Sequence, residues 1–368
     1  MKIALIGYEA NVAHRVGSNQ YAFELMKALY NLDTENHYTI FLPSQPLPDL
    51  PKPRNNWQYK VGGPKKFWNF FGLPLSLFLQ HPKPDVVFSP GHYSPLFSPA
   101  PLVVSIMDLG YLKFPFHFTR TTYWKLKFLT SFSIKKARSL LTISEATKND
   151  IIKYYQIEPE KITVAYPGYD QDKFKKQISE QEIKQVKGKY KIKNDYLLFL
   201  STLKPSKNIE GLLKAFAKLK DNKLSLVIAG KKGWMFESVF AKAKDLDLLE
   251  KVVFTDFVPD IEVPALIAGA KSFVLPSFWE GFGIPVVEAM AVGTPVVVAN
   301  TGSLPEVVGE AGIVVNPDDP QDIARGIKES FSKKEQLIEK GFKQIVKYDW
   351  GKCGQKVLKV LLKEAKND

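Results

Sequence analysis

Short apolar runs that favour β-strands alternate with segments of helical period along nearly the whole chain of 368 residues. This alternation is typical of parallel sheets built from strand–helix–strand units. It breaks in a polar, lysine-rich stretch between residues 168 and 194 and restarts at Tyr196–Leu200. The runs of the second series are almost entirely apolar, as expected for strands covered on both faces. The sequence therefore predicts an α/β protein with two doubly wound, Rossmann-like domains.

The expected domain limits follow from the polar stretch that begins at residue 168 and from the C-terminal segment that begins at residue 350. Residues 1–167 are expected to form an N-terminal domain and residues 168–349 a C-terminal one, while the tail 350–368 has the apolar spacing of an amphipathic helix. Two such domains place the carboxyl ends of two parallel sheets across a central cleft, where ligands of these folds bind. The expected strands are Lys2–Ile6, Tyr38–Leu42, Asp85–Phe88, Leu102–Ile106, Leu140–Ile143, Ile162–Ala165, Tyr196–Leu200, Leu224–Ala229, Val252–Thr255, Ser272–Leu275 and Pro295–Val298.

The charge balance favours an anionic partner. Lys and Arg number 51 against 38 Asp and Glu, a net charge of +13, which suits a phosphorylated ligand, an acidic lipid surface or nucleic acid. The single cysteine, Cys353, excludes an internal disulfide and a cysteine-built metal site. The first apolar run is too short for a signal peptide, and no run approaches the ~18 residues of a spanning helix. We therefore expect a cytoplasmic protein.

The strongest local motif is Glu280-Gly-Phe-Gly-Ile-Pro-Val-Val-Glu288, which directly follows an expected strand and opens a helix at Pro285. Gly281 and Gly283 leave backbone amides uncovered at the positive end of that helix, a natural seat for phosphate or sugar oxygens. Glu280 is placed to accept hydrogen bonds from hydroxyls. The alternative interpretation makes Glu280 a solvated loop acid and Glu288 a charge on the helix face.

Two further loops follow strands in the same way. Lys207 lies just before a helix that begins at Ile209, where its ammonium could neutralise a phosphate and Asn208 could cap the helix; Lys207 could equally be a solvated charge. Gly17 lies between the first strand and the first helix, where a phosphate could approach the backbone, although a plain turn fits as well. Its loop lacks the G-x-G-x-x-G fingerprint, which weakens a dehydrogenase interpretation.

The segment from Val258 to Asp319 resembles the retaining GT-B glycosyltransferases of family 4, the group 1 transferases. It carries, in order, VPDIEVPALIAGA, FVLPSFWEGFGIPVVEAMAVGTPVVVANTGSLPEVVGEAG and NPDD. The N-terminal half is similar in RVGSNQYAFELMKAL, DVVFSPGHYSPL, TISEATKNDI and VAYPGYD. The resemblance implies an acceptor-side N-terminal domain, a C-terminal domain that binds a nucleotide-sugar donor, and a C-terminal helix that packs back toward the N-terminal domain.

The resemblance also implies roles for individual residues. Glu280 would bind hydroxyls of the donor sugar, Glu288 the ribose, and Lys207 the diphosphate together with the amides of the Gly281–Ile284 loop. Gly17 would approach the diphosphate from the other domain. The implied catalytic residues are Glu280, Asp108 and Lys207. The implied donor-binding residues are Gly17, Thr202, Lys204, Lys207, Glu280, Gly281, Phe282, Gly283, Ile284 and Glu288.

The chain departs from the family pattern at three places, one of which, Ile267 in place of a tyrosine, is expected to affect packing only. Met107-Asp108 stands where the family usually has a His-Asp pair, so the histidine that would contact the donor sugar is absent. Lys204 stands near the usual position of an arginine and lacks its bidentate geometry. On the acceptor side we expect His92, for which a structural histidine that caps a turn is an equal alternative, and Ser144.

The sequence favours a metal-independent reaction without a cofactor, because the Asp-x-Asp motif Asp245-Leu-Asp247 falls in an expected helix and not after a strand. The resemblance favours transfer of a hexose, with retention, to a glycan or lipid-linked acceptor. Its mannosyltransferase-like branch favours mannose and a GDP-sugar over a UDP-sugar. The alternatives are a GT-B nucleotide-sugar epimerase and a donor-binding protein whose catalysis has degenerated, the latter motivated by Met107.

A basic, aromatic stretch at residues 113–138 suits peripheral contact with an anionic membrane, on the inner face of the plasma membrane for a cytoplasmic protein. Lys65-Lys66-Phe67-Trp68 would extend this patch. The alternative is an amphipathic helix that buries its aromatic side. We expect no nucleic-acid partner, because no recognised nucleic-acid module is present.

Overall fold

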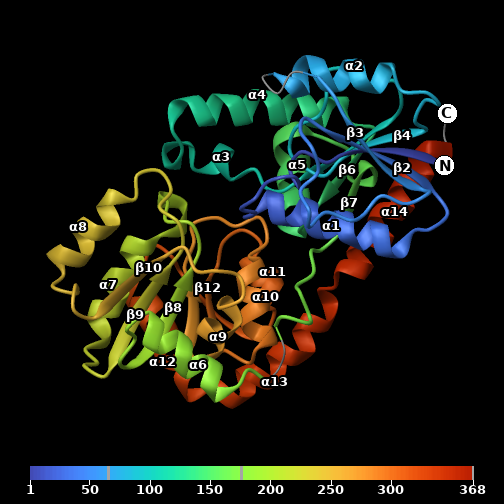
Figure 1. Ribbon diagram of the computed structural model, residues 1–368. Helices are drawn as coiled ribbons and strands as arrows, with labels where there is room; N and C mark the ends of the chain where they lie inside the picture. The colour runs from blue at the N-terminus through green and yellow to red at the C-terminus, as the bar shows by residue number, and fades with distance from the viewer. Residues whose placement is uncertain (64–66, 175–176, 367–368) are drawn as a thin grey trace. The chain divides into compact units, whose positions relative to one another are not determined.

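The chain forms two compact units in its computed structural model, which describes residues 1–63, 67–174 and 177–366 (Figure 1). Unit 1 combines Met1–Gly168 with Asp349–Asp368, and unit 2 spans Tyr169–Tyr348. Both units are parallel sheets with helices, which confirms the predicted α/β fold class. The tail helix α14 (Trp350–Lys366) packs within unit 1, as the sequence predicted.

Unit 1 contains a seven-stranded sheet with the order β3-β2-β1-β4-β5-β6-β7. The order reverses between β1 and β4, so the loops that follow these two strands open at the carboxyl edge of the sheet, the usual ligand position in such folds. The strands are β1 (Lys2–Ile6), β2 (His37–Leu42), β3 (Trp57–Val61), β4 (Val86–Ser89), β5 (Leu102–Ile106), β6 (Ser139–Thr142) and β7 (Ile162–Val164).

The helices of unit 1 cover both faces of this sheet. On one face α14 packs against α1, and Figure 1 shows the two side by side. On the other face Trp68, Leu77, Ile134 and Ile151 join alternate strand residues in one core cluster. The helical segments are α1 (Ser18–Leu32), η1 (Trp68–Gly72), α2 (Leu73–Phe78), α3 (Gly110–Lys113), η2 (Pro115–His117), α4 (Arg120–Lys136), α5 (Glu145–Tyr155), η3 (Pro159–Lys161) and α14.

Unit 2 contains a six-stranded parallel sheet with the order β10-β9-β8-β11-β12-β13. Its order reverses between β8 (Asp195–Leu200) and β11 (Ser272–Leu275), which pair directly at the centre. The other strands are β9 (Leu224–Ala229), β10 (Val252–Asp256), β12 (Val296–Ala299) and β13 (Gly312–Val315). The helical segments are α6 (Glu180–Lys189), η4 (Pro205–Lys207), α7 (Ile209–Leu219), α8 (Glu237–Asp245), α9 (Val263–Ala268), α10 (Ile284–Ala291), α11 (Leu304–Val308), α12 (Pro320–Ser332), α13 (Lys334–Gln344) and η5 (Ile345–Lys347).

Every predicted strand is present, within one residue at each end, but the sequence missed β3 and β13. Both are edge strands. The polar stretch after residue 168 also contains a helix that was not predicted, α6, because only Val186 of that helix is buried and its apolar period is weak. A capping box at Ser179 and Glu182 fixes where α6 begins. Among the described residues, no helix has the length and apolar character needed to cross a bilayer.

Candidate functional site

The loops that follow β8 and β11 meet at the carboxyl edge of the unit 2 sheet. They bring Lys207 and Glu280 together, although 73 positions separate the two residues. Lys207 Nζ lies 2.5 Å from Glu280 Oε1, and the two side chains are only 9% and 12% exposed. Phe278 N also donates to Ser206 O at 2.9 Å, which ties the two loops together. This nearly buried ion pair is the centre of the candidate site.

Ser277 and a third loop, at residues 301–303, fix the position of Glu280. Ser277 Oγ donates to Glu280 Oε1 at 2.8 Å, and both N and Oγ of Ser303 donate to the Glu280 carbonyl at 3.2 Å. Gly302 has a φ of +61°, and a Cβ there would lie 2.6 Å from the Glu280 carbonyl oxygen. The backbone of Glu280 can therefore lie in this position only beside a glycine.

The amino end of α10 faces the same edge of the sheet. Gly283, with a φ of +94°, is its N-cap, and no side chain caps the helix. Pro285 has no amide hydrogen and Val286 N donates to Gly283 O at 2.9 Å, so the amides of Gly283 and Ile284, with the helix dipole, are what favour an anion at this end. Phe282 is buried and packs edge-on against the ring of Tyr348, 5.3 Å between centroids, so this residue can offer a ligand its backbone but not its ring. Gly281, Ile284 and Glu288 are partly exposed.

The prediction that Asn208 is the N-cap residue of α7 is confirmed, although its side chain does not supply the cap. Asn208 stands at the N-cap position with a left-handed backbone, φ 53°, and its side chain makes no capping bond. Its Nδ2 instead donates to Pro276 O at 3.1 Å and to Pro317 O at 2.7 Å, so Asn208 links the loops after β8, β11 and β13. Thr202 and Lys204 are half-buried in the same region, and Lys204 Nζ lies 5.2 Å from the centre of the Trp234 ring.

In unit 1, the predicted residues cluster in the loops after β1, β4 and β5. Gly17 is the N-cap of α1, with a φ of 55° and open space around it. His92 Nδ1 is buried and has no hydrogen-bond partner among the described residues, so it caps no turn through that atom. Burial lowers the pKa of His92, while the nearby carboxylates of Asp108 and Glu9 oppose that shift.

Glu9 is a residue of this cluster that the sequence analysis missed. Its Oε2 accepts from Asn19 Nδ2 at 2.6 Å, which holds the carboxylate beside the amino end of α1. Its side chain also lies against Gly91, where a Cβ would be 3.2 Å from Glu9 Oε1. The sequence feature that could have identified Glu9 is its position in a loop, three residues after the first strand.

Ser144, Met107 and Asp108 all accept hydrogen bonds from neighbouring residues of unit 1. Ser144 is fully buried: its Oγ accepts from Thr147 N at 3.1 Å and caps α5, so its hydroxyl does not face a ligand. Met107 is 5% exposed, and its carbonyl accepts from Thr147 Oγ1 at 3.0 Å. Asp108 Oδ1 accepts from Gly110 N at 2.8 Å.

The motif Asp245-Leu-Asp247 does not lie wholly in a helix, because Asp245 ends α8 and Asp247 follows it with a φ of 54°. Within the described ranges, no group of three or more His, Cys, Asp or Glu side chains is arranged to hold a metal ion.

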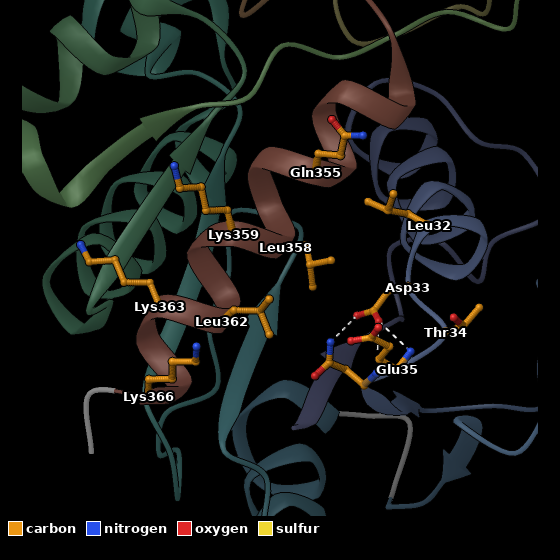
Figure 2. Close-up of a pocket in the computed structure, with 11 residues that line it drawn as sticks. Leu32, Asp33, Thr34, Glu35, Gln355, Leu358, Lys359, Leu362, Lys363 and Lys366 are labelled. Carbon is orange, nitrogen blue, oxygen red and sulfur yellow. Dashed lines mark hydrogen bonds between the residues drawn. The ribbon is translucent and has the colours of Figure 1, made fainter.

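A groove of about 550 Å³ in unit 1 lies away from these loops (Figure 2). It runs between the carboxyl end of α1 and α14, at the edge of the sheet opposite Gly17. Asp33 in its wall accepts from Tyr38 Oη at 2.7 Å and from Asn36 Nδ2 at 2.9 Å, so that carboxylate is engaged in the fold. The groove is lined by Leu32, Asp33, Thr34, Glu35, Asn36, Gln355, Leu358, Lys359, Leu362, Lys363 and Lys366.

Comparisons with known proteins identify the class. A family model described as glycosyl transferases group 1 matches residues 179–344, and one described as glycosyltransferase family 4 matches residues 16–173. The structure of Anabaena Alr3699/HepE in complex with UDP and glucose superimposes with a TM-score of 0.78 at 20% identity, covering 99% of this chain and 100% of that one. The fold is that of the GT-B glycosyltransferases.

Relatives of known name agree with this class. The O-antigen chain mannosyltransferase B of Escherichia coli is 33% identical over 228 residues, 60% of this chain and 59% of the relative. The O-antigen chain mannosyltransferase RfbU of Salmonella typhimurium is 28% identical over 287 residues, 78% of this chain and 76% of the relative. Together the two family models match residues 16–173 and 179–344, which confirms the resemblance to the group 1 glycosyltransferases of family 4.

Proposed function

We propose that this protein is a retaining mannosyltransferase that takes mannose from a nucleotide-diphosphate sugar, GDP-mannose in preference to a UDP-sugar, without a metal ion. The observation that carries the proposal is the Lys207–Glu280 pair beside the uncapped end of α10. The mannosyltransferase names of the two relatives support the choice of sugar. The acceptor is a glycan or a lipid-linked glycan.

The unit 2 site offers what a departing diphosphate needs. The ammonium of Lys207 and the backbone amides of Gly283 and Ile284 are fixed in the fold, so they can take up developing negative charge without reorganising. A diphosphate would compete with Glu280 for Lys207. The Glu280 carboxylate, still held by Ser277, would then accept hydrogen bonds from the donor sugar, and Glu288, one turn into α10, would bind the ribose.

The chemical step that fits this arrangement is front-face substitution. The bond from the anomeric carbon to the diphosphate oxygen breaks, and the acceptor oxygen forms a bond to the same face of that carbon. The acceptor proton passes to an oxygen of the leaving nucleoside diphosphate. No separate protein base is required, and the configuration of the anomeric carbon is retained.

Unit 1 is assigned the acceptor. Its carboxyl edge carries His92 Nδ1, which has no hydrogen-bond partner in the described part of the chain, together with the carboxylates of Glu9 and Asp108, groups that can hold sugar hydroxyls. A lipid-linked acceptor would bring the enzyme to a membrane surface, and we place that contact on an anionic membrane, on its cytoplasmic face.

The test is a transfer assay in EDTA with GDP-mannose, UDP-glucose and an oligosaccharide acceptor, with the product anomer read by NMR. Transfer from GDP-mannose with retention is expected. Conversion of the nucleotide sugar without an acceptor would show an epimerase instead. Donor binding without turnover would show a degenerate site, and Met107→His should then raise turnover; a loss of transfer on chelation would contradict the metal-free site.

A further inference from the structure

The segment Phe67–Leu79 is apolar on both of its faces. It contains no charged residue, and it forms η1 and α2. Trp68, Leu73 and Leu77 point into the core, while five other large apolar side chains are between 46% and 67% exposed. These exposed residues are Phe67, Phe71, Leu75, Phe78 and Leu79. A water-facing helix normally carries polar residues opposite its buried stripe, so this outer face is adapted to something other than water.

The neighbouring helix α4 has a different outer face, one that combines aromatic and basic side chains. Trp124 and Phe128 are 61% and 68% exposed and lie one turn apart. Lys127 Nζ lies 5.0 Å from the centre of the Trp124 ring, and Lys125 is exposed beside it. The prediction that α4 buries its aromatic side is therefore wrong for these two rings. Lys65 and Lys66, which the sequence placed in the same patch, lie outside the described residues.

The two outer faces lie on the same side of the unit 1 sheet. Residues of η1, α2 and α4 join one core cluster against one sheet face, and Figure 1 shows α2 and α4 on that side. This region is strongly basic, because Asp85 and Asp108 are the only acidic residues in the sequence from residue 50 to residue 144. Of these, Asp85 Oδ2 accepts from Lys2 N at the start of β1.

We infer that η1 and α2 form a wedge that inserts into an anionic lipid bilayer, with α4 lying on the headgroups beside it. The wedge supplies apolar contact and α4 supplies charge. A second copy of this chain is a poorer occupant, because stacking two such faces would bring the lysines of both α4 helices together. The inference deepens the proposed membrane contact and rests on the proposed function only because a lipid-linked acceptor gives that contact a purpose.

The apolar contact of η1 and α2 and the charge of α4 can be measured separately, because they respond differently to salt. Attraction of lysines to anionic lipid is screened by salt, whereas burial of phenylalanine and leucine side chains is not. Binding should therefore have two components, a salt-sensitive one from α4 and a salt-resistant one from the wedge.

The experiment is sedimentation with vesicles of phosphatidylcholine, alone or mixed with phosphatidylglycerol, at low and high salt. A wedge variant carries Phe71→Ser, Leu75→Ser and Leu79→Ser, and a charge variant carries Lys125→Gln, Lys127→Gln and Lys135→Gln. The control variant, Leu249→Ser with Ile261→Ser, removes exposed apolar residues of unit 2.

Wild type and the control should bind vesicles that contain phosphatidylglycerol equally well. The wedge variant should lose at least ~10-fold of the binding that persists at high salt. The charge variant should lose chiefly the low-salt component. If the wedge variant folds poorly, Phe71→Ser alone is used, with a smaller loss expected in the same component.

Three results would overturn the inference: no binding of wild type to anionic vesicles, unchanged high-salt binding of the wedge variant, or a dimer that the wedge variant dissociates without any change in vesicle binding. Thermal stabilisation by GDP, measured on the same variants, separates this failure from a failure of the proposed function. That stabilisation depends on unit 2 and should be unchanged in every variant.

Discussion

The Lys207 ammonium and the Glu280 carboxylate, on the loops after β8 and β11, neutralise each other at a distance of 2.5 Å. Both come from loops that the fold holds rigidly, through Ser277, Ser303 and Asn208. We therefore propose two roles for the pair, a structural one in the fold of unit 2 and a chemical one toward a diphosphate.

Breaking the pair from one side should destabilise unit 2. Lys207→Met leaves the Glu280 carboxylate nearly buried without its cation, and a loss of about 3 kcal/mol in the free energy of unfolding is expected. Lys207→Met combined with Glu280→Gln should lose less than Lys207→Met alone, because no uncompensated charge remains. Urea unfolding of the single and double variants measures this. Strictly additive losses would show that the two charges do not interact.

Gly302→Ala should damage activity more than stability. The new Cβ would overlap the Glu280 carbonyl, and the left-handed backbone would cost about 1–2 kcal/mol. A displaced Glu280 should lower kcat/KM about 100-fold. Gly188→Ala is the matched control, since a Cβ there meets nothing within 4 Å and Gly188 lies in α6. That control should be neutral or stabilising by up to about 1 kcal/mol, and equal activity of the two variants would refute the role of Gly302.

Asn208 variants separate its hydrogen bonds from its backbone conformation. Asn208→Gly keeps the left-handed backbone but leaves the carbonyls of Pro276 and Pro317 without their donor, for a loss of about 2 kcal/mol. Asn208→Ala should lose about 1 kcal/mol more, because alanine disfavours a φ of 53°. Thermal unfolding ranks the three proteins. Equal stability of Asn208→Ala and Asn208→Gly would contradict the predicted cost of the left-handed backbone conformation for alanine.

His92 should make the protein less stable as the pH falls. Burial lowers the pKa of His92 in the folded state, opposed by the charges of Asp108 and Glu9, so the unfolded chain binds the proton more readily. The stabilising contribution of the neutral ring is present above the unfolded pKa and is lost as the pH falls toward the folded one.

The pH test compares melting temperatures between about pH 7 and pH 5. His92→Asn should show a smaller decrease than wild type. His81→Asn, at an exposed histidine, should behave like wild type. A decrease in His92→Asn as large as that of wild type would exclude His92 as the source.

The sequence predicted the central strands well because both of their faces are covered, which makes continuous apolar runs such as that of β12. It missed β3, an edge strand whose residues Gln58 to Val61 are only partly buried or exposed. The positions of Lys207 and Glu280 in loops after strands pointed to these two residues, and the structure brings them together. Their mutual contact, and the link that Asn208 makes to Pro317, depend on tertiary structure that no local pattern contains.

The most direct test of the central claim is calorimetric binding of GDP in EDTA to wild type and Lys207→Ala, with Lys214→Ala in α7 as a surface lysine control. We predict metal-free binding to wild type and to the control, and an affinity lower by ~10–100-fold in Lys207→Ala, the loss of one charge-assisted hydrogen bond. Equal affinity for wild type and Lys207→Ala, or binding to wild type only when a divalent metal is added, would contradict the diphosphate site.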